Sequence, residues 1–108
     1  MHAMSTDTMP SADTVLDALR QVEDPELGMD IVEIGLIYEV TFPSPGTVKV
    51  SYSLTSPACP AGPEITGNIV DTVRAIPGVE TVEPELVWSP AWTPDLMSED
   101  AKFILGIG

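Results

Sequence analysis

The 108-residue sequence contains one cysteine, one histidine and only four lysines and arginines together. One cysteine cannot form a disulfide within the chain, so the usual sign of a secreted, disulfide-bonded protein is missing. No apolar run approaches the roughly 18 residues that a membrane span needs. Residues 1–10 also lack the basic start and apolar stretch of a signal peptide. We therefore predict a cytoplasmic protein.

Positive charge is scarce, because 17 aspartates and glutamates oppose the four basic residues and give a formal net charge of −13. Nucleic acids and anionic membranes are bound through clustered lysine and arginine, so we expect neither as a partner. The excess of acidic residues favours solubility or, alternatively, forms a surface for a basic partner protein.

The hydrophobic pattern predicts a flexible tail over residues 1–11 and a single domain over residues 12–108. Within the domain, helical spacing of apolar residues and strand-like alternation follow one another, separated by proline and glycine. The predicted elements are, in order, a helix from Asp13 to the stop signal Asp24-Pro25, strands over Leu36–Phe42 and Thr47–Leu54, a helix from Pro63 to Pro77-Gly78, a strand over Val79–Trp88 and a helix over Asp95–Leu105.

This order predicts a two-layer α+β fold, with helices packed on one face of a small mixed three-stranded sheet. The first two strands, joined by a turn at Pro43–Gly46, are expected to form an antiparallel hairpin, with a bend or bulge at Gly35. The third strand follows a helix and can therefore pair in parallel with one hairpin strand. Pro84 indicates that this third strand lies at an edge or contains a bulge.

Cys59 is the first candidate for chemistry, because it lies between a predicted strand and a predicted helix. The unpaired N–H groups and the dipole at a helix start favour a thiolate, which is the nucleophilic and metal-binding form. The alternative is that this lone cysteine is only a small buried apolar residue.

Thr55 and Ser56 precede the cysteine and are the second candidates. Their hydroxyls are able to donate to an anionic sulfur or a bound ligand, or they simply order the turn.

An acidic loop between the first helix and the first strand is the third candidate. Carboxylates ligate metals or act as bases, although acidic clusters in loops are usually only solvated. No histidine lies nearby to complete a metal motif, since His2 is in the tail. The loop acids are Asp24, Glu26, Asp30 and Glu33.

Two tryptophans, Trp88 and Trp92, flank the segment Ser89-Pro90-Ala91. We expect both to pack on the core, with the alternative that they line a pocket.

Several segments around these residues occur in an order typical of one known family. The segments are Asp24-Pro25-Glu26-Leu27-Gly28, Ile31 to Tyr38, Leu54-Thr55-Ser56-Pro57-Ala58-Cys59-Pro60, Pro77-Gly78-Val79 and Leu86 to Ser98. From about Val15 to Gly106 the chain resembles the iron–sulfur cluster assembly family that includes SufT and the PaaD-like proteins.

The resemblance implies a small cytosolic α+β protein that helps to mature iron–sulfur proteins. It also implies that the family's site residues fall on Asp24, Glu26, Thr55, Ser56 and Cys59, with the acidic loop beside the cysteine loop in space. Family members often carry a bulky apolar residue after Cys-Pro, whereas Ala61-Gly62-Pro63 is small here, so a more open local pocket is expected.

We therefore predict an accessory factor or transient carrier in iron–sulfur cluster assembly, which is not an enzyme and whose Cys59 is the ligand of iron or of a cluster. Clusters are usually held by four cysteines, so binding would need a homodimer, an assembly scaffold, a client apoprotein or an external thiol. Two alternatives stay open, namely a thiol-dependent enzyme with Cys59 as nucleophile and a pure protein-interaction adaptor.

Overall fold

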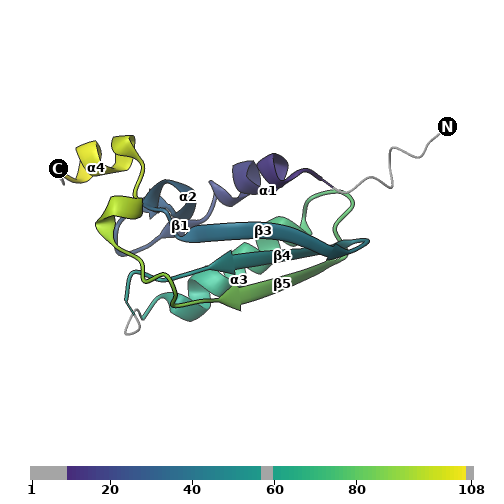
Figure 1. Ribbon diagram of the computed structural model, residues 1–108. Coiled ribbons are helices and arrows are strands. Elements are labelled where there is room, and N and C mark those ends of the chain that lie inside the picture. The colour runs from purple at the N-terminus through teal and green to yellow at the C-terminus, as the bar shows by residue number, and fades with distance from the viewer. Residues whose placement is uncertain (1–9, 57–59, 107–108) are drawn as a thin grey trace.

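The computed structural model describes residues 10–56 and 60–106 (Figure 1). The elements are, in chain order, α1 (Ala12–Leu19), β1 (Glu23–Asp24), β2 (Met29–Asp30), α2 (Ile31–Ile34), β3 (Ile37–Ser44), β4 (Thr47–Tyr52), α3 (Gly62–Arg74), β5 (Thr81–Leu86), the short 3-10 helix η2 (Pro94–Leu96) and α4 (Glu99–Leu105). The predicted α+β class is confirmed.

The main sheet has the strand order β3-β4-β5. β3 and β4 form the predicted antiparallel hairpin, and β5 pairs in parallel with β4, so both expectations are confirmed. Pro84 lies in β5, which is an edge strand. A proline is tolerated there because the outer edge needs no ladder N–H.

Both long helices, α1 and α3, lie behind the sheet on the same face (Figure 1). Each helix buries one apolar stripe, as the predicted helical spacing requires. The sheet contributes alternate residues of β4, because successive strand side chains point to opposite faces. The buried residues are Val15 and Leu19 of α1, Ile65, Ile69 and Val73 of α3, and Val48, Val50 and Tyr52 of β4.

The first helix is shorter than predicted, because it ends at Leu19 with Arg20 as its C-cap rather than running to Asp24. The N–H of Ile31 donates to the carbonyl oxygen of Val22 at 2.9 Å, and β1 then pairs with β2. These backbone bonds hold residues 22–24 in an extended conformation. The acidic segment predicted as a loop is therefore a tight two-stranded turn.

Residues 31–34 belong to a stretch that the sequence marks as β-prone, yet they form the helical turn α2. The carboxylate of Asp30 caps this turn and so overrides the weak strand preference of its β-branched residues. Gly35 ends α2 in the left-handed region, with φ +86°, so the predicted bend is confirmed. A Cβ at Gly35 would lie 2.2 Å from the carbonyl oxygen of Leu96, so only glycine fits.

The hairpin turn is also tighter than predicted, because β3 continues through Pro43 to Ser44. Ser44 Oγ donates to Thr47 Oγ1 across the turn at 3.0 Å, and Gly46 adopts φ +78°.

The chain after β5 forms a C-terminal arm, which we define as residues 89–106. The single helix predicted over Asp95–Leu105 is wrong, because Met97 is extended and buried between η2 and α4. Ser98 then caps α4 by accepting the N–H of Ala101 at 3.0 Å. Burial of Met97 therefore interrupts the helix, whereas the predicted end at Gly106 is confirmed.

Candidate functional site

Asp24 is fully buried in the turn between β1 and β2. Its Oδ1 accepts the N–H groups of Glu26 at 2.8 Å and Leu27 at 3.3 Å, which gives the carboxylate a structural role in shaping the turn. The second oxygen, Oδ2, is buried without a hydrogen-bond partner among the described residues. An unpaired buried carboxylate oxygen is costly, so Asp24 is the strongest candidate for contact with a further group.

The other predicted acids lie in different surroundings. The side chain of Glu26 is exposed. Asp30 is half-buried, and its Oδ1 accepts the N–H groups of Val32 at 3.0 Å and Glu33 at 2.9 Å. The interpretation of these acids as merely solvated therefore fails for Asp24 and Asp30, which organise the backbone around them.

Glu33 anchors the C-terminal arm. Its Oε1 accepts the hydroxyl of Ser98 at 2.5 Å, and its Oε2 pairs with Arg20 Nη1 at 2.6 Å. The hydroxyl of Ser98 and then the guanidinium of Arg20 stabilise the charged form, which lowers the pKa of Glu33 below its ordinary value. Glu33 therefore contributes to the fold rather than to a candidate ligand set.

A row of backbone hydrogen bonds connects the acidic turn to the strand that leads to the cysteine. Ile31 N–H donates to Val22 O at 2.9 Å, Leu36 N–H donates to Ile31 O at 3.0 Å, and Ser53 N–H donates to Leu36 O at 2.8 Å. Val22 lies two residues before Asp24, and Ser53 lies two residues before Thr55. The row thus fixes the starts of the two candidate segments relative to each other.

Thr55 is half-buried and Ser56 is exposed, three and four residues after the end of β4. Cys59 lies outside the described residues, so its predicted proximity to Asp24 and Glu26 stays a prediction. Ser53 is a residue that sequence reasoning missed. It is fully buried, and its Oγ has no hydrogen-bond partner among the described residues.

The segment containing Cys59 leads into α3. This helix begins at Gly62, one residue earlier than predicted, and Ala61 occupies the N-cap without a side-chain hydrogen bond. Pro63 in the first turn has no N–H to donate. A helix start without a side-chain cap favours a negatively charged group nearby, which agrees with the predicted thiolate.

A groove of about 570 Å³ lies between α3 and the ends of β4 and β5. Its apolar walls come from Leu54, Leu86 and Trp88, and its helical wall includes Pro63 and Gly67. The expectation that Trp88 packs on the core is wrong, because 45% of its surface is exposed. The alternative, that it lines a pocket, is the correct one.

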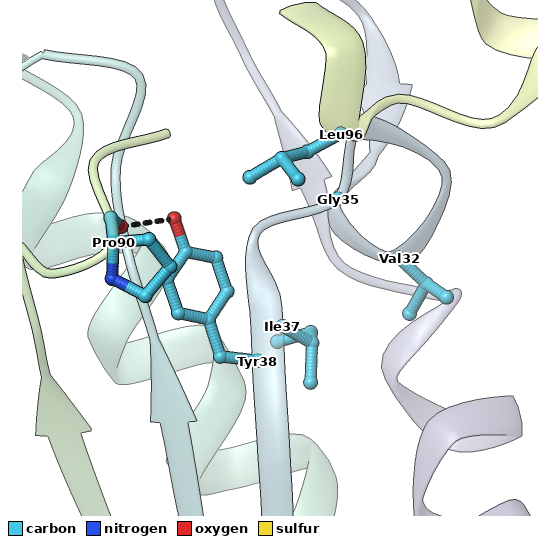
Figure 2. Close-up of a pocket in the computed structure, with 6 residues that line it drawn as sticks. All are labelled: Val32, Gly35, Ile37, Tyr38, Pro90 and Leu96. Atoms are coloured by element: carbon cyan, nitrogen blue, oxygen red, sulfur yellow. Dashed lines mark hydrogen bonds between the residues drawn. The ribbon is translucent and has the colours of Figure 1, made fainter. Parts of the chain in front are cut away.

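A second pocket, of about 490 Å³, lies between α2, β3 and the C-terminal arm (Figure 2). Tyr38 Oη donates to the carbonyl oxygen of Pro90 at 2.9 Å across it. Nearby, Trp92 is half-buried against the core and donates from Nε1 to Ile34 O at 2.9 Å. For Trp92 the expected packing on the core is therefore confirmed.

Across residues 10–56 and 60–106, no group of three or more histidine, cysteine, aspartate or glutamate side chains is arranged to hold a metal ion. None of the helices in these ranges combines the length and apolar character needed to cross a membrane.

Comparison with known proteins identifies the family. The family model for "Iron-sulfur cluster assembly protein" matches residues 12–83. An Fe–S protein maturation auxiliary factor SufT from Staphylococcus aureus is 45% identical over 86 residues, which cover 80% of this chain and 98% of that protein. An iron–sulfur cluster carrier protein from a Synechocystis species is 43% identical over 75 residues, which cover 69% of this chain but 21% of that protein.

The fold is shared with a solved structure. The crystal structure of a domain of unknown function from Bacillus anthracis superimposes with a TM-score of 0.84 at 33% identity, covering 99% of this chain and 100% of that one. All five candidate residues lie within the matched residues 12–83, whereas the C-terminal arm lies beyond them. On these grounds, the chain belongs to the iron–sulfur cluster assembly protein family.

Proposed function

We propose that the protein is an auxiliary factor in iron–sulfur cluster assembly and in the maturation of iron–sulfur proteins. The observation that carries the proposal is the family match over residues 12–83, which includes Asp24, Glu26, Thr55, Ser56 and Cys59. Relatives named as a maturation auxiliary factor and as a cluster carrier support an assisting or carrying role. Iron or a cluster would then be cargo that the protein holds transiently.

In this proposal the thiolate of Cys59 binds the cargo, and Thr55 and Ser56 donate hydrogen bonds to sulfur. The uncapped start of α3 supports a charged sulfur at this position. Asp24 would offer to the cysteine segment or to iron its Oδ2, which has no partner among residues 10–56 and 60–106, and such a contact would remove the cost of an unpaired buried oxygen. Glu26, exposed on the same turn, would supply a further oxygen.

One thiolate leaves most cluster coordination sites to other molecules, because clusters are usually held by four cysteines. The remaining ligands would come from an assembly scaffold, a client apoprotein, a second copy of the chain or an external thiol. Such incomplete coordination suits a protein that passes its cargo on. The cytoplasm stays the predicted place of this exchange.

Anaerobic reconstitution with ferrous iron, sulfide and a thiol tests the carrier role. We expect wild type to gain iron and sulfide, measured by chemical analysis, absorption and Mössbauer spectra, and Cys59→Ser to lose most of both. Asp24→Asn keeps the turn-forming Oδ1 while removing the charge, so its iron content should fall with little loss of stability.

A matched control is the double variant Cys59→Ser, Thr81→Cys, which restores one thiol at an exposed position. Thr81 pairs with Thr47 at the start of β4, the opposite end of the sheet from the cysteine segment. Equal loading of this control and wild type would refute a specific site at Cys59. If wild type itself gains no iron, the carrier role fails and the adaptor role remains.

The uncapped start of α3 also favours a second candidate, a thiol-dependent enzyme with Cys59 as nucleophile. The rate of iodoacetamide alkylation against pH measures the pKa of the thiol. An apparent pKa near the ordinary thiol value of about 8.5 would count against an activated nucleophile.

A further inference from the structure

The groove between α3 and the ends of β4 and β5 exposes large apolar side chains that the fold does not cover. Leu86 is 40% exposed and Trp88 is 45% exposed, and both line the groove with Leu54. Concave apolar surfaces on a folded domain are typical of sites that bind another molecule. We infer that this groove docks an amphipathic, positively charged helix of a partner protein.

Gly67 gives the first argument for a helix. It lies in the interior of α3, where glycine costs about 0.5–1 kcal/mol relative to alanine. A Cβ at Gly67 would meet no heavy atom within 4 Å, so nothing within the described residues requires the glycine. Its absent side chain leaves the α3 backbone open beside Thr66, where a second helix is able to approach closely.

The edge of β5 argues against an added strand. Thr81 N–H donates to Gly46 O and Val87 N–H donates to Tyr52 O, so the N–H groups of alternate residues from 81 to 87 point to β4. The intervening residues 82, 84 and 86 face the outer edge, where Pro84 has no N–H. A strand added there would lose its central hydrogen bond, whereas a helix docks through side chains.

The charges around the groove define the partner. Glu64 and Asp71 lie three residues before and four residues after Gly67 on α3, and both are exposed. Glu83 and Glu85 of β5 point to the opposite face of the sheet, where Glu85 contacts Ser51 and Lys49, so the negative charge beside the groove comes from α3. A helix with an apolar stripe flanked by lysine or arginine complements this surface.

Little positive charge offsets these acids. Of the four basic residues, Lys49 pairs with Glu85 at 3.3 Å, and Arg20 and Lys102 form ion pairs elsewhere. Arg74, the last residue of α3, lies three residues after Asp71 and offsets part of that charge. A second copy of the chain is a poor occupant, since each copy carries a net charge of −13.

The groove adjoins the ends of the cysteine segment, because Leu54 and Gly62, which both line it, are the residues on either side of 55–61. The inference rests on the proposed function only in taking the partner to be a protein. It does not depend on cluster binding. A failure of helix docking would therefore leave the proposed cargo binding at Cys59 intact, and the reverse also holds.

A synthetic 20-residue helix with leucine on one stripe and lysine elsewhere is a suitable probe. We expect saturable binding by fluorescence anisotropy. Gly67→Leu should weaken it at least tenfold, because the new side chain projects into the groove from a position where its Cβ meets no heavy atom within 4 Å. Phe103→Ala is the matched control, since Phe103 is 87% exposed on α4. The affinity of this variant for the synthetic helix should stay within twofold of the wild-type value.

Circular dichroism of Gly67→Leu checks that the fold is intact. Three results would overturn the inference: unchanged affinity in folded Gly67→Leu, equal binding of a peptide with the same residues in strand-like alternation, or equal binding when glutamate replaces lysine. Sedimentation that finds a wild-type dimer dissociated by Gly67→Leu would assign the groove to a second copy and overturn it as well.

Discussion

The two pockets have similar volumes, about 490 Å³ beside the C-terminal arm and about 570 Å³ between α3 and β5, but they differ in what closes them. At the first, the chain bridges its own gap through Tyr38 and Pro90, and Leu96 packs over Gly35 (Figure 2). Both pockets expose apolar side chains, Leu96 at the first and Leu86 and Trp88 at the second, so the difference lies in the bond between Tyr38 and Pro90. The first pocket is therefore a contact between the C-terminal arm and the rest of the fold, whereas we assign the second to another molecule.

Of the variants considered, Gly35→Ala should most strongly disrupt the contact between the C-terminal arm and the rest of the fold. The positive φ and the clash with the carbonyl of Leu96 together should lower the free energy of unfolding by about 3 kcal/mol, measured in urea. Gly28→Ala is the control, because Gly28 has φ +71° with no atom within 4 Å of an added Cβ. Equal losses in both variants would mean that the arm is not held against Gly35.

The two tryptophans compare the pockets directly. Trp92→Ala removes partly buried surface and the hydrogen bond to Ile34, and it should cost about 2 kcal/mol in thermal or urea unfolding. Trp88→Ala should cost less than about 1 kcal/mol because that side chain is already half in solvent. The comparison breaks down if Trp88→Ala proves the more destabilising of the two.

Glu33→Gln tests the anchor of the arm through pH. The folded-state pKa of Glu33 is lowered, so its charge stabilises the fold at pH values above the ordinary glutamate pKa of 4.5. This stabilisation is lost as the pH falls through the lowered pKa. At pH 7 the variant should be less stable by about 1 kcal/mol, and the gap should shrink below pH 4.5. Glu23→Gln, at an exposed glutamate of β1, serves as the control for removing one negative charge from this region.

Gly67→Ala should change the free energy of unfolding least, and it should stabilise the protein whereas the other variants destabilise it. It should raise the free energy of unfolding by about 0.5–1 kcal/mol, since the helix gains propensity and nothing is displaced. Gly62→Ala should not gain in this way, because its Cβ would lie 3.0 Å from Leu54 Cδ1. A destabilising Gly67→Ala would show that the glycine serves the fold rather than a partner.

Much of the fold is predictable because its signals are local. Proline, glycine and apolar spacing place the helix that contains Ile65, the hairpin and the edge strand that contains Pro84. The helical turn at Ile31 is not predictable, because its cap by Asp30 competes with the strand preference of its β-branched residues. The break at Met97 also depends on tertiary burial, which no local pattern records.

The candidate site is predictable only in part. Residue type and position single out Asp24, and the structure adds its burial and an oxygen that is unpaired within the described part of the chain. The groove escapes sequence reasoning because it combines Trp88 with residues from β4 and α3, and Gly67 carries no chemistry of its own. A glycine in the interior of a predicted helix is the signal that would have revealed it.

The row of backbone bonds from Val22 through Ile31 and Leu36 to Ser53 has a consequence for motion. Each bond borders the next, so breaking one exposes its neighbour to water, and the row opens as a unit. We therefore expect the acidic turn and the entrance to the cysteine segment to open together, so that whatever releases one from the body of the protein also releases the other.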